Sequence, residues 1–190
     1  MNRLSLPPED LVLDLERGIR DVPNFPKDGV TFKDLAGVWS VPGMNQRIVE
    51  EACTKFQGQP NGGPDCIVGI ESRGFIYGMA MAISMGIPFV VFRKKGKLPP
   101  PTCSVDYSLE YGQASLECAV EAFPAGSQVL IHDDVLATGG TASAAAQLVR
   151  KLDAEVWGFS FLLELAFLKG EAEIETKEPN AILHTYLTIQ

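Results

Sequence analysis

Short apolar runs alternate with stretches of helical periodicity along most of the chain, and this alternation predicts the elements of the fold. Helices are predicted where apolar residues recur every three or four positions, over residues 9–20, 43–57, 75–85 and from 141 onward. Strands are predicted for the short apolar runs, over residues 66–70, 88–93, 113–120, 129–132, 156–164 and 181–189. Strands that alternate with helices indicate an α/β fold, a mostly parallel twisted sheet flanked by helices on both faces.

Two segments interrupt this pattern. Residues 21–33 contain Pro23, Pro26 and Gly29 and are predicted to be irregular. Residues 95–112 are predicted to form a long loop, and connections of that length are usually functional or disordered. Because the sequence has no repeat, low-complexity tract or linker, we expect a single domain over residues 1–190.

Composition narrows the class of protein. With 190 residues and 46% hydrophobic content, the chain is long enough to bury one core. It has no apolar run of about 20 residues and an N-terminus too acidic for a signal peptide, so we expect a soluble cytoplasmic protein without a membrane partner. Its four cysteines are scattered without a CxxC pair, which favours reduced thiols over a zinc site or disulfides. The net charge of −8 argues against a nucleic-acid partner, and an anionic ligand would need a local cluster of cations.

Residues 129–141 (VLIHDDVLATGGT) combine a strand, a loop and a helix start. Asp133 and Asp134 follow the predicted strand, where ligands of α/β sheets collect, and their carboxylates can accept hydrogen bonds from vicinal sugar hydroxyls. The following loop supplies glycines that let the backbone wrap an anion, hydroxyl groups and free N–H groups, through Ala137, Thr138, Gly139, Gly140 and Thr141. The combination predicts a site for a ribose 5-phosphate. An acidic turn and an ordinary helix start explain either half alone, and the missing lysine after the glycines excludes a Walker A loop.

Two further segments carry cations towards the same edge of the sheet. Residues 71–75 (ESRGF) lie between a strand and a helix, so the planar fork of Arg73 is placed to pair with a phosphate. Arg93, Lys94, Lys95 and Lys97 place four cations in five residues at the end of the next strand. Either segment alone is explained by a solvated surface, but in an acidic chain both favour an anion site.

These segments, together with residues 107–112 (YSLEYG), occur in the order found in one family. From about residue 22 to residue 170 the chain resembles the type I phosphoribosyltransferases, and in particular those that act on adenine. The resemblance implies transfer of the 5-phosphoribosyl group from phosphoribosyl pyrophosphate (PRPP) to N9 of adenine, giving AMP and pyrophosphate. It also implies a homodimer, and a Mg²⁺ cofactor held mainly by the pyrophosphate and water without direct protein ligands.

The resemblance assigns roles to individual residues. Glu71, Ser72 and Arg73 would form the pyrophosphate loop, with a cis peptide between Glu71 and Ser72, and Arg73 would also act in catalysis. Lys94 would contact the pyrophosphate, with Arg93 and Lys97 nearby. Within a mobile loop at residues 95–112, Glu110 and Tyr111 would close over the substrates, and Glu110 would be the general acid/base. An N-terminal region over residues 1–40 would bind adenine through Thr31, Phe32 and Lys33, together with Leu165. Without the resemblance, core packing explains Phe32 and Leu165 equally well.

Three departures from the family pattern stand out. Lys33 replaces an arginine that is common there, the prolines from Pro99 to Pro101 replace a run that usually contains glycine, and His132 replaces an aliphatic residue. The prolines are expected to stiffen the start of the loop. Two other functions stay open: the same transfer to hypoxanthine, guanine or xanthine, and a non-catalytic PRPP-sensing regulator. A regulator would need a nucleic-acid-binding surface or an extra module, and this acidic chain indicates neither.

Overall fold

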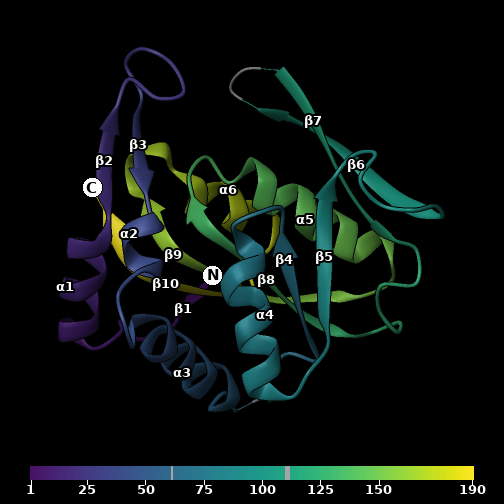
Figure 1. Ribbon diagram of the computed structural model, residues 1–190. Helices are drawn as coiled ribbons and strands as arrows, with labels where there is room; N and C mark the ends of the chain where they lie inside the picture. Colours follow the sequence, from purple (N-terminus) through teal and green to yellow (C-terminus); the bar gives the residue numbers. More distant parts are fainter. Residues whose placement is uncertain (61, 110–111) are drawn as a thin grey trace.

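A mixed sheet runs through the middle of the molecule (Figure 1). The computed structural model describes residues 1–60, 62–109 and 112–190. Within these residues eight strands form the sheet in the order β1-β10-β9-β8-β4-β5-β7-β6. Their bounds are β1 (Asn2–Arg3), β4 (Cys66–Ile70), β5 (Phe89–Lys94), β6 (Thr102–Leu109), β7 (Gly112–Ala119), β8 (Gln128–Leu136), β9 (Glu155–Leu165) and β10 (Ile182–Ile189). The strands from β1 to β5 in this order pair in parallel, and only β7 and β6 are antiparallel, so the predicted fold class is confirmed.

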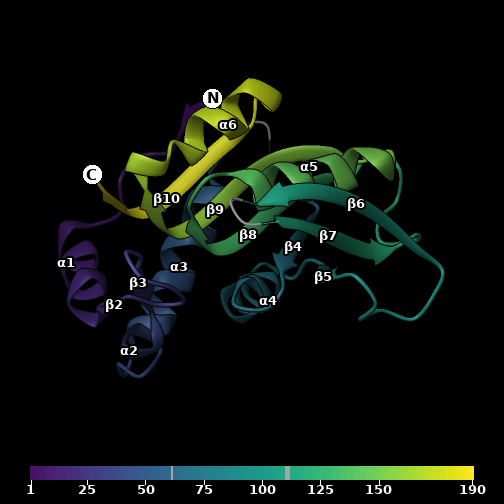
Figure 2. The same cartoon turned by 90° about the horizontal axis from the view of Figure 1, so that it is seen from above.

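Helices cover both faces of the sheet, as the view from above shows (Figure 2). One face carries α5 (Gly140–Lys151) and α6 (Gly170–Lys177). The other carries α1 (Glu9–Gly18), α2 (Ala36–Trp39), α3 (Met44–Gln57) and α4 (Gly74–Met85). A short 3-10 turn, η1 (Ala166–Leu168), joins β9 to α6. None of the helices in the described part of the chain has the length and apolar character that a membrane-spanning segment needs.

The central strands bury side chains on both faces. In β8, Val129 and Ile131 pack into the core under α5, whereas Leu130 packs into the core under α3 and α4. In β4, Val68 packs into the core under α5, and Ile67 packs into the core under α3 and α4. A strand covered on both faces reads as a continuous apolar run, which is why these strands could be predicted from the sequence.

The prediction that the whole of residues 95–112 is an irregular loop is wrong. Residues 102–109 form β6, which pairs with β7 in an antiparallel hairpin that matches Val105 with Leu116. The underlying pattern alternates Cys103, Val105 and Tyr107 with polar residues, and Val105 is buried in the core under α5. Alternation of this kind is typical of a strand with one covered face, and the neighbouring prolines obscured it.

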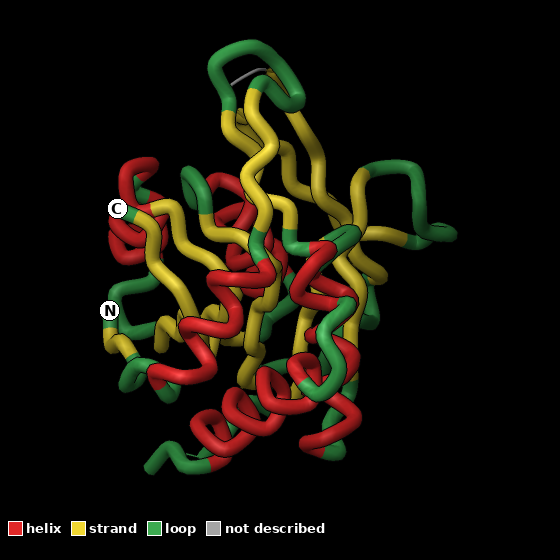
Figure 3. Tube along the Cα trace, turned by 60° about the vertical axis from the view of Figure 1, so that its left-hand side comes forward, coloured by secondary structure: helices red, strands yellow, loops and turns green. Residues whose placement is uncertain are grey.

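The prediction that residues 21–33 are irregular holds for residues 24–30 but is wrong at both ends of this segment. A separate two-stranded antiparallel sheet joins β2 (Arg20–Pro23) and β3 (Thr31–Asp34), with Val22 opposite Phe32. Each strand has only four residues, too few for a periodicity to stand out beside the prolines. Figures 1 and 3 show this hairpin and the β6–β7 hairpin projecting from the same side of the molecule. Four further elements were not predicted from the sequence: β1, α2, the 3-10 turn η1 and the largely polar α6.

Candidate active site

A cavity of about 470 Å³ lies at the carboxyl ends of the central strands. Four segments build its walls: β3, the start of α4, the end of β8 with the loop that follows it, and the end of β9 with η1. The structure brings together in these walls the predicted residues Thr31, Phe32, Lys33, Arg73, Asp133, Asp134, Ala137, Thr138, Thr141 and Leu165. Two further lining residues, Val135 and Leu168, were not predicted from the sequence. The spacing along the sequence could have indicated both residues. Val135 lies two residues after Asp133 and so shares a strand face with it, and Leu168 lies one helical turn after Leu165.

The acidic pair lies within β8, because this strand extends to Leu136 and does not end at His132 as predicted. β4 pairs with β8 only as far as His132, while β9 continues to pair on the other side through Leu136. Asp133 and Asp134 therefore lie where one edge of β8 is no longer covered by β4. Strand β9 pairs with β8 along one edge at this point, and the cavity lies where β4 no longer pairs with the other edge.

The two carboxyl groups are held in a weakly solvated position. Burial raises the pKa of both, and the charge of Asp134 raises the pKa of Asp133 further. The backbone N–H of Asp134 donates a hydrogen bond of 2.9 Å to Oδ1 of Asp133. Hydrogen bonds from a ligand would favour the charged form of such carboxyl groups, so the pair is suited to bind hydroxyl donors.

Arg73 connects the acidic pair to the aromatic wall of the cavity. It immediately precedes α4, and its Nε lies 2.7 Å from Oδ2 of Asp134. Its guanidinium carbon lies 5.2 Å from the ring centroid of Phe32, close enough for a cation–π contact. The charge of Arg73 lowers the pKa of Asp134 and so opposes the effect of burial. Arg73 is thus a fixed positive charge between the acidic pair and β3.

The glycine loop after β8 encloses a second, smaller cavity of about 70 Å³ at the start of α5, which Gly139, Gly140 and the neighbouring loop residues line. Gly139 has a φ of 83°, which L side chains rarely adopt, and a Cβ there would lie 2.7 Å from the carbonyl oxygen of Gly170. The first N–H groups of a helix lack partners within the helix, and those of α5 point towards this loop. The arrangement is suited to a small anion.

Neither cavity is lined by Arg93 and Lys94 at the end of β5 or by Lys97 just after it, and these three residues contact Glu71 instead. Both Nε and Nη2 of Arg93 lie 3.3 Å from the Glu71 carboxylate, and Nζ of Lys97 lies 3.2 Å from it. The backbone N–H of Lys94 donates a 3.0 Å hydrogen bond to the same group. The peptide bond between Glu71 and Ser72 is cis, which confirms that prediction. Glu71 therefore joins the loop after β4 to the loop after β5.

These contacts keep Glu71 ionised. Burial alone would raise its pKa, but the hydrogen bonds from Lys94, Arg93 and Lys97 outweigh burial and lower the pKa to about 2. A carboxyl group whose pKa is lowered in the folded state contributes stability above its ordinary value of 4.5. That contribution is lost as the pH falls from 4.5 towards 2.

We therefore expect Glu71→Gln to flatten the acid end of the stability profile. The free energy of unfolding in urea should fall less steeply with decreasing pH below 4.5 in this variant than in the wild type, because the amide does not titrate. Glu9→Gln, at the exposed start of α1, serves as the control. Parallel profiles for Glu71→Gln and the wild type would contradict the prediction.

The apolar end of the cavity lies between β3 and the end of β9. Phe32 makes an edge contact with Phe25 at 5.3 Å between ring centroids, and Leu165 lines the wall formed by β9 and η1. The ammonium group of Lys33 pairs with Asp21 of β2 at 2.7 Å. One edge of β3 thus pairs with β2, and Thr31, Phe32 and Lys33 of β3 line the cavity.

Glu110 and Tyr111, predicted to close over the substrates, lie outside the described residues. Among residues 1–60, 62–109 and 112–190, no group of three or more histidine, cysteine, aspartate or glutamate side chains is arranged to hold a metal ion. His132 is fully buried with its pKa lowered by burial to about 3, so it is a neutral core residue.

Comparisons with known proteins agree with this geometry. The phosphoribosyl transferase domain family matches residues 44–182. An adenine phosphoribosyltransferase of Synechococcus sp. (strain JA-2-3B'a(2-13)) is 51% identical over 158 residues, which cover 83% of this chain and 89% of the relative. An adenine phosphoribosyltransferase of Acidothermus cellulolyticus is 41% identical over 178 residues, 94% of this chain and 99% of the relative.

Solved structures that superpose on this chain are also adenine phosphoribosyltransferases. The Saccharomyces cerevisiae adenine phosphoribosyltransferase, complexed with an imino-altritol bisphosphate and adenine, superposes with a TM-score of 0.85 at 38% identity, covering 93% of this chain and 98% of the other. The Giardia lamblia enzyme, complexed with 9-deazaadenine, superposes with a TM-score of 0.85 at 34% identity, covering 94% and 98%. The family match, the sequence identities and the superpositions agree with one another. The chain therefore belongs to the phosphoribosyl transferase domain family, among the adenine phosphoribosyltransferases.

Proposed function

We propose that this chain transfers the 5-phosphoribosyl group of PRPP to N9 of adenine and releases AMP and pyrophosphate, a reaction of purine salvage. The observation that carries the proposal is the cavity, which unites an acidic pair, a neighbouring anion loop and an apolar wall. These three features correspond to the ribose, the phosphate and the base of one nucleotide. The relatives that share the fold are named for this activity.

The acidic pair and the glycine loop bind the phosphorylated sugar in this proposal. Asp133 and Asp134 accept hydrogen bonds from the vicinal ribose hydroxyls, and the 5-phosphate binds in the small cavity at the start of α5. Ala137, Thr138, Gly139, Gly140 and Thr141 enclose the phosphate through backbone N–H groups, hydroxyls and the positive end of the helix dipole. The ribose ring then lies between the two groups, with C1 towards the base.

The pyrophosphate binds beside the loop of Glu71, Ser72 and Arg73. Arg73 stabilises the charge that develops on the leaving group, and Lys94 contributes a second cation from the end of β5. Arg93 and Lys97 hold the loop through Glu71. In this proposal a Mg²⁺ ion enters with PRPP and is held mainly by the pyrophosphate and water, since Mg²⁺ keeps several waters and is bound through few carboxylates. Such an ion, when bound, neutralises charge on the pyrophosphate.

Adenine binds at the apolar end of the cavity, within an N-terminal region over residues 1–40 together with Leu165. Phe32 and Leu165 pack against the base, and the backbone of Thr31 to Lys33 reads its edge. A backbone N–H and C=O pair matches N1 and the 6-amino group of adenine, whereas a 6-oxopurine reverses this pattern. Each unpaired buried polar group costs about 1–3 kcal/mol, so two mismatches exclude hypoxanthine and guanine effectively. Because recognition uses the backbone, Lys33 in place of the common arginine is tolerated.

Glu110 is the general acid/base of the reaction and, with Tyr111, covers the substrates from the segment at residues 95–112. We expect Glu110→Ala to lower the turnover number more than it weakens PRPP binding, because proton transfer acts in the transition state. Steady-state kinetics and the dissociation constant of PRPP, measured on one preparation, check this. Full turnover in the variant would exclude the acid/base role.

The overall activity is tested with Mg²⁺, PRPP and one purine base at a time, with the monophosphate product identified. AMP from adenine, and no product from hypoxanthine, guanine or xanthine, is the expected result. A product from a 6-oxopurine would assign the chain to another purine. Binding of PRPP without any product would favour a PRPP sensor.

A homodimer in the cytoplasm completes the proposal. Exposed apolar residues on α4, namely Ile76, Met79 and Ile83, provide a surface that a second copy could cover. All four cysteines are free thiols, as expected in a reducing compartment. The molar mass in solution tests the dimer, and a monomer at micromolar concentration would exclude it.

A further inference from the structure

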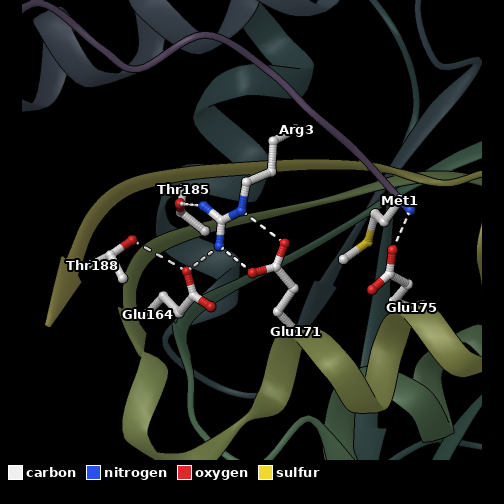
Figure 4. A network of polar contacts seen from close by, with 7 residues as sticks. All are labelled: Met1, Arg3, Glu164, Glu171, Glu175, Thr185 and Thr188. Carbon is white, nitrogen blue, oxygen red and sulfur yellow. Dashed lines mark hydrogen bonds and ion pairs between the residues drawn. The ribbon is translucent and has the colours of Figure 1, made fainter. Parts of the chain in front are cut away.

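The guanidinium group of Arg3 joins three segments that are far apart in the sequence (Figure 4). Its Nε and Nη2 donate hydrogen bonds of 2.7 and 2.6 Å to the two carboxylate oxygens of Glu171. Its Nη1 donates a hydrogen bond of 3.1 Å to Oγ1 of Thr185, and Nη2 also pairs with Glu164. All three nitrogens of the planar fork are therefore engaged at once, a geometry that the single ammonium group of lysine cannot reproduce.

The buried carboxylate of Glu164 depends on the positive charge of Arg3 for compensation. Its side chain is only 3% exposed, at the end of β9, and Oγ1 of Thr188 donates it a further hydrogen bond of 3.2 Å. A buried carboxylate is costly unless a positive charge and hydrogen bonds compensate it. Arg3 reaches Glu164 because β1 pairs in parallel with β10, which in turn pairs with β9.

The two carboxylates that Arg3 holds mark the ends of the segment over residues 164–171. Between them, Leu165 and Leu168 form part of the wall of the 470 Å³ cavity. Gly170 packs against the glycine loop so closely that a Cβ would overlap the carbonyl oxygen of Ala137. This short segment thus touches both the proposed base site and the proposed phosphate loop, and Arg3 fixes both of its ends.

We propose that Arg3 is a positioning residue, which holds the segment over residues 164–171 as the wall of the adenine site. Arg3 itself does not line the cavity. Its effect on the base is transmitted through the backbone between Glu164 and Glu171. The proposal rests on the proposed function, because it assigns Leu165 and Leu168 to the base.

The test compares Arg3→Met with two further variants in steady-state kinetics. We expect Arg3→Met to raise the KM for adenine about 2- to 30-fold, the range that residues without ligand contact commonly produce. The kcat should change less, because the acidic pair, Arg73 and the residues around Glu71 do not contact Arg3. Arg150→Met is the matched control, since Arg150 pairs with Glu178 directly after α6 and has no contact with Glu164. Its KM for adenine should stay within about twofold of the wild type.

The double variant Arg3→Met/Glu164→Gln separates positioning from charge compensation. It removes the uncompensated buried charge, so the melting temperature should recover relative to Arg3→Met, but the bridge to Glu171 stays broken. We expect the KM for adenine to remain raised in this variant. A KM that returns to the wild-type value, or a KM that is unchanged in Arg3→Met, would overturn the proposal. A wild-type protein that forms no AMP from adenine would overturn the proposed function instead.

Discussion

Asp133→Asn is expected to stabilise the protein while it removes most of the activity. Burial and the charge of Asp134 raise the pKa of Asp133, so at neutral pH the folded state bears the cost of ionising this group. Asparagine removes that cost and retains the Oδ1 that accepts the N–H of Asp134. Single stabilising substitutions commonly add about 0.5–2 kcal/mol to the free energy of unfolding, and we expect a gain in that range for Asp133→Asn.

The activity should change in the opposite direction. A hydrogen bond to a charged group contributes about 1.5–3 kcal/mol, so loss of the charge that receives the ribose hydroxyls should lower kcat/KM for PRPP about 10- to 100-fold. Urea unfolding and initial rates, measured at pH 7.5, check both signs. The gain in stability should shrink as the pH falls towards the ordinary carboxyl value, because the wild-type pair then becomes protonated.

Asp65→Asn is the matched control for Asp133→Asn. Asp65 is exposed at the other end of the strands, where its carboxylate accepts the backbone N–H of Gln128 at the start of β8. The control should leave kcat/KM unchanged and should not stabilise the protein. If Asp133→Asn lowered the stability, or kept full activity, the electrostatic interpretation of the acidic pair would be wrong.

Arg73→Met is expected to lower kcat by about 10²–10³, the range seen when one stabilising donor is removed from a developing negative charge. The same change should destabilise the protein, because Asp134 loses the charge that lies 2.7 Å from it and Phe32 loses its cation–π partner. The stability change therefore has the opposite sign to that of Asp133→Asn, although both substitutions lower activity.

A double-mutant cycle tests this relation. In Asp133→Asn/Arg73→Met the net charge of the cavity is the same as in the wild type, so the loss of stability should be smaller than in Arg73→Met alone. Arg17→Met removes an exposed arginine that pairs with Asp14 on α1, and it should change neither kcat nor stability appreciably. Strictly additive stability changes would show that Arg73 and the acidic pair act independently.

Some features of this fold could be predicted because local sequence encodes them. β4 and β8 are covered on both faces, so their residues form continuous apolar runs, and α3 repeats Met44, Ile48, Ala52 and Phe56 on its buried face. The mostly parallel sheet follows from the alternation of such elements. Strands β2, β3 and β6 could not be predicted in this way, because β2 and β3 have only four residues each and the prolines from Pro99 to Pro101 directly precede β6.

The candidate site, like the fold, could be predicted from the sequence only in part. The sequence alone determined which chemistry is present, since an acidic pair, a glycine loop and an arginine after a strand each have a characteristic local pattern. Tertiary structure decided which of these groups share a cavity, that Arg93 and Lys97 hold Glu71 outside both cavities, and that Leu168 joins the base wall. It also decided that Arg3 reaches Glu164 and Glu171, because contacts between residues more than 160 positions apart arise only when the strands pair and leave no trace in local periodicity.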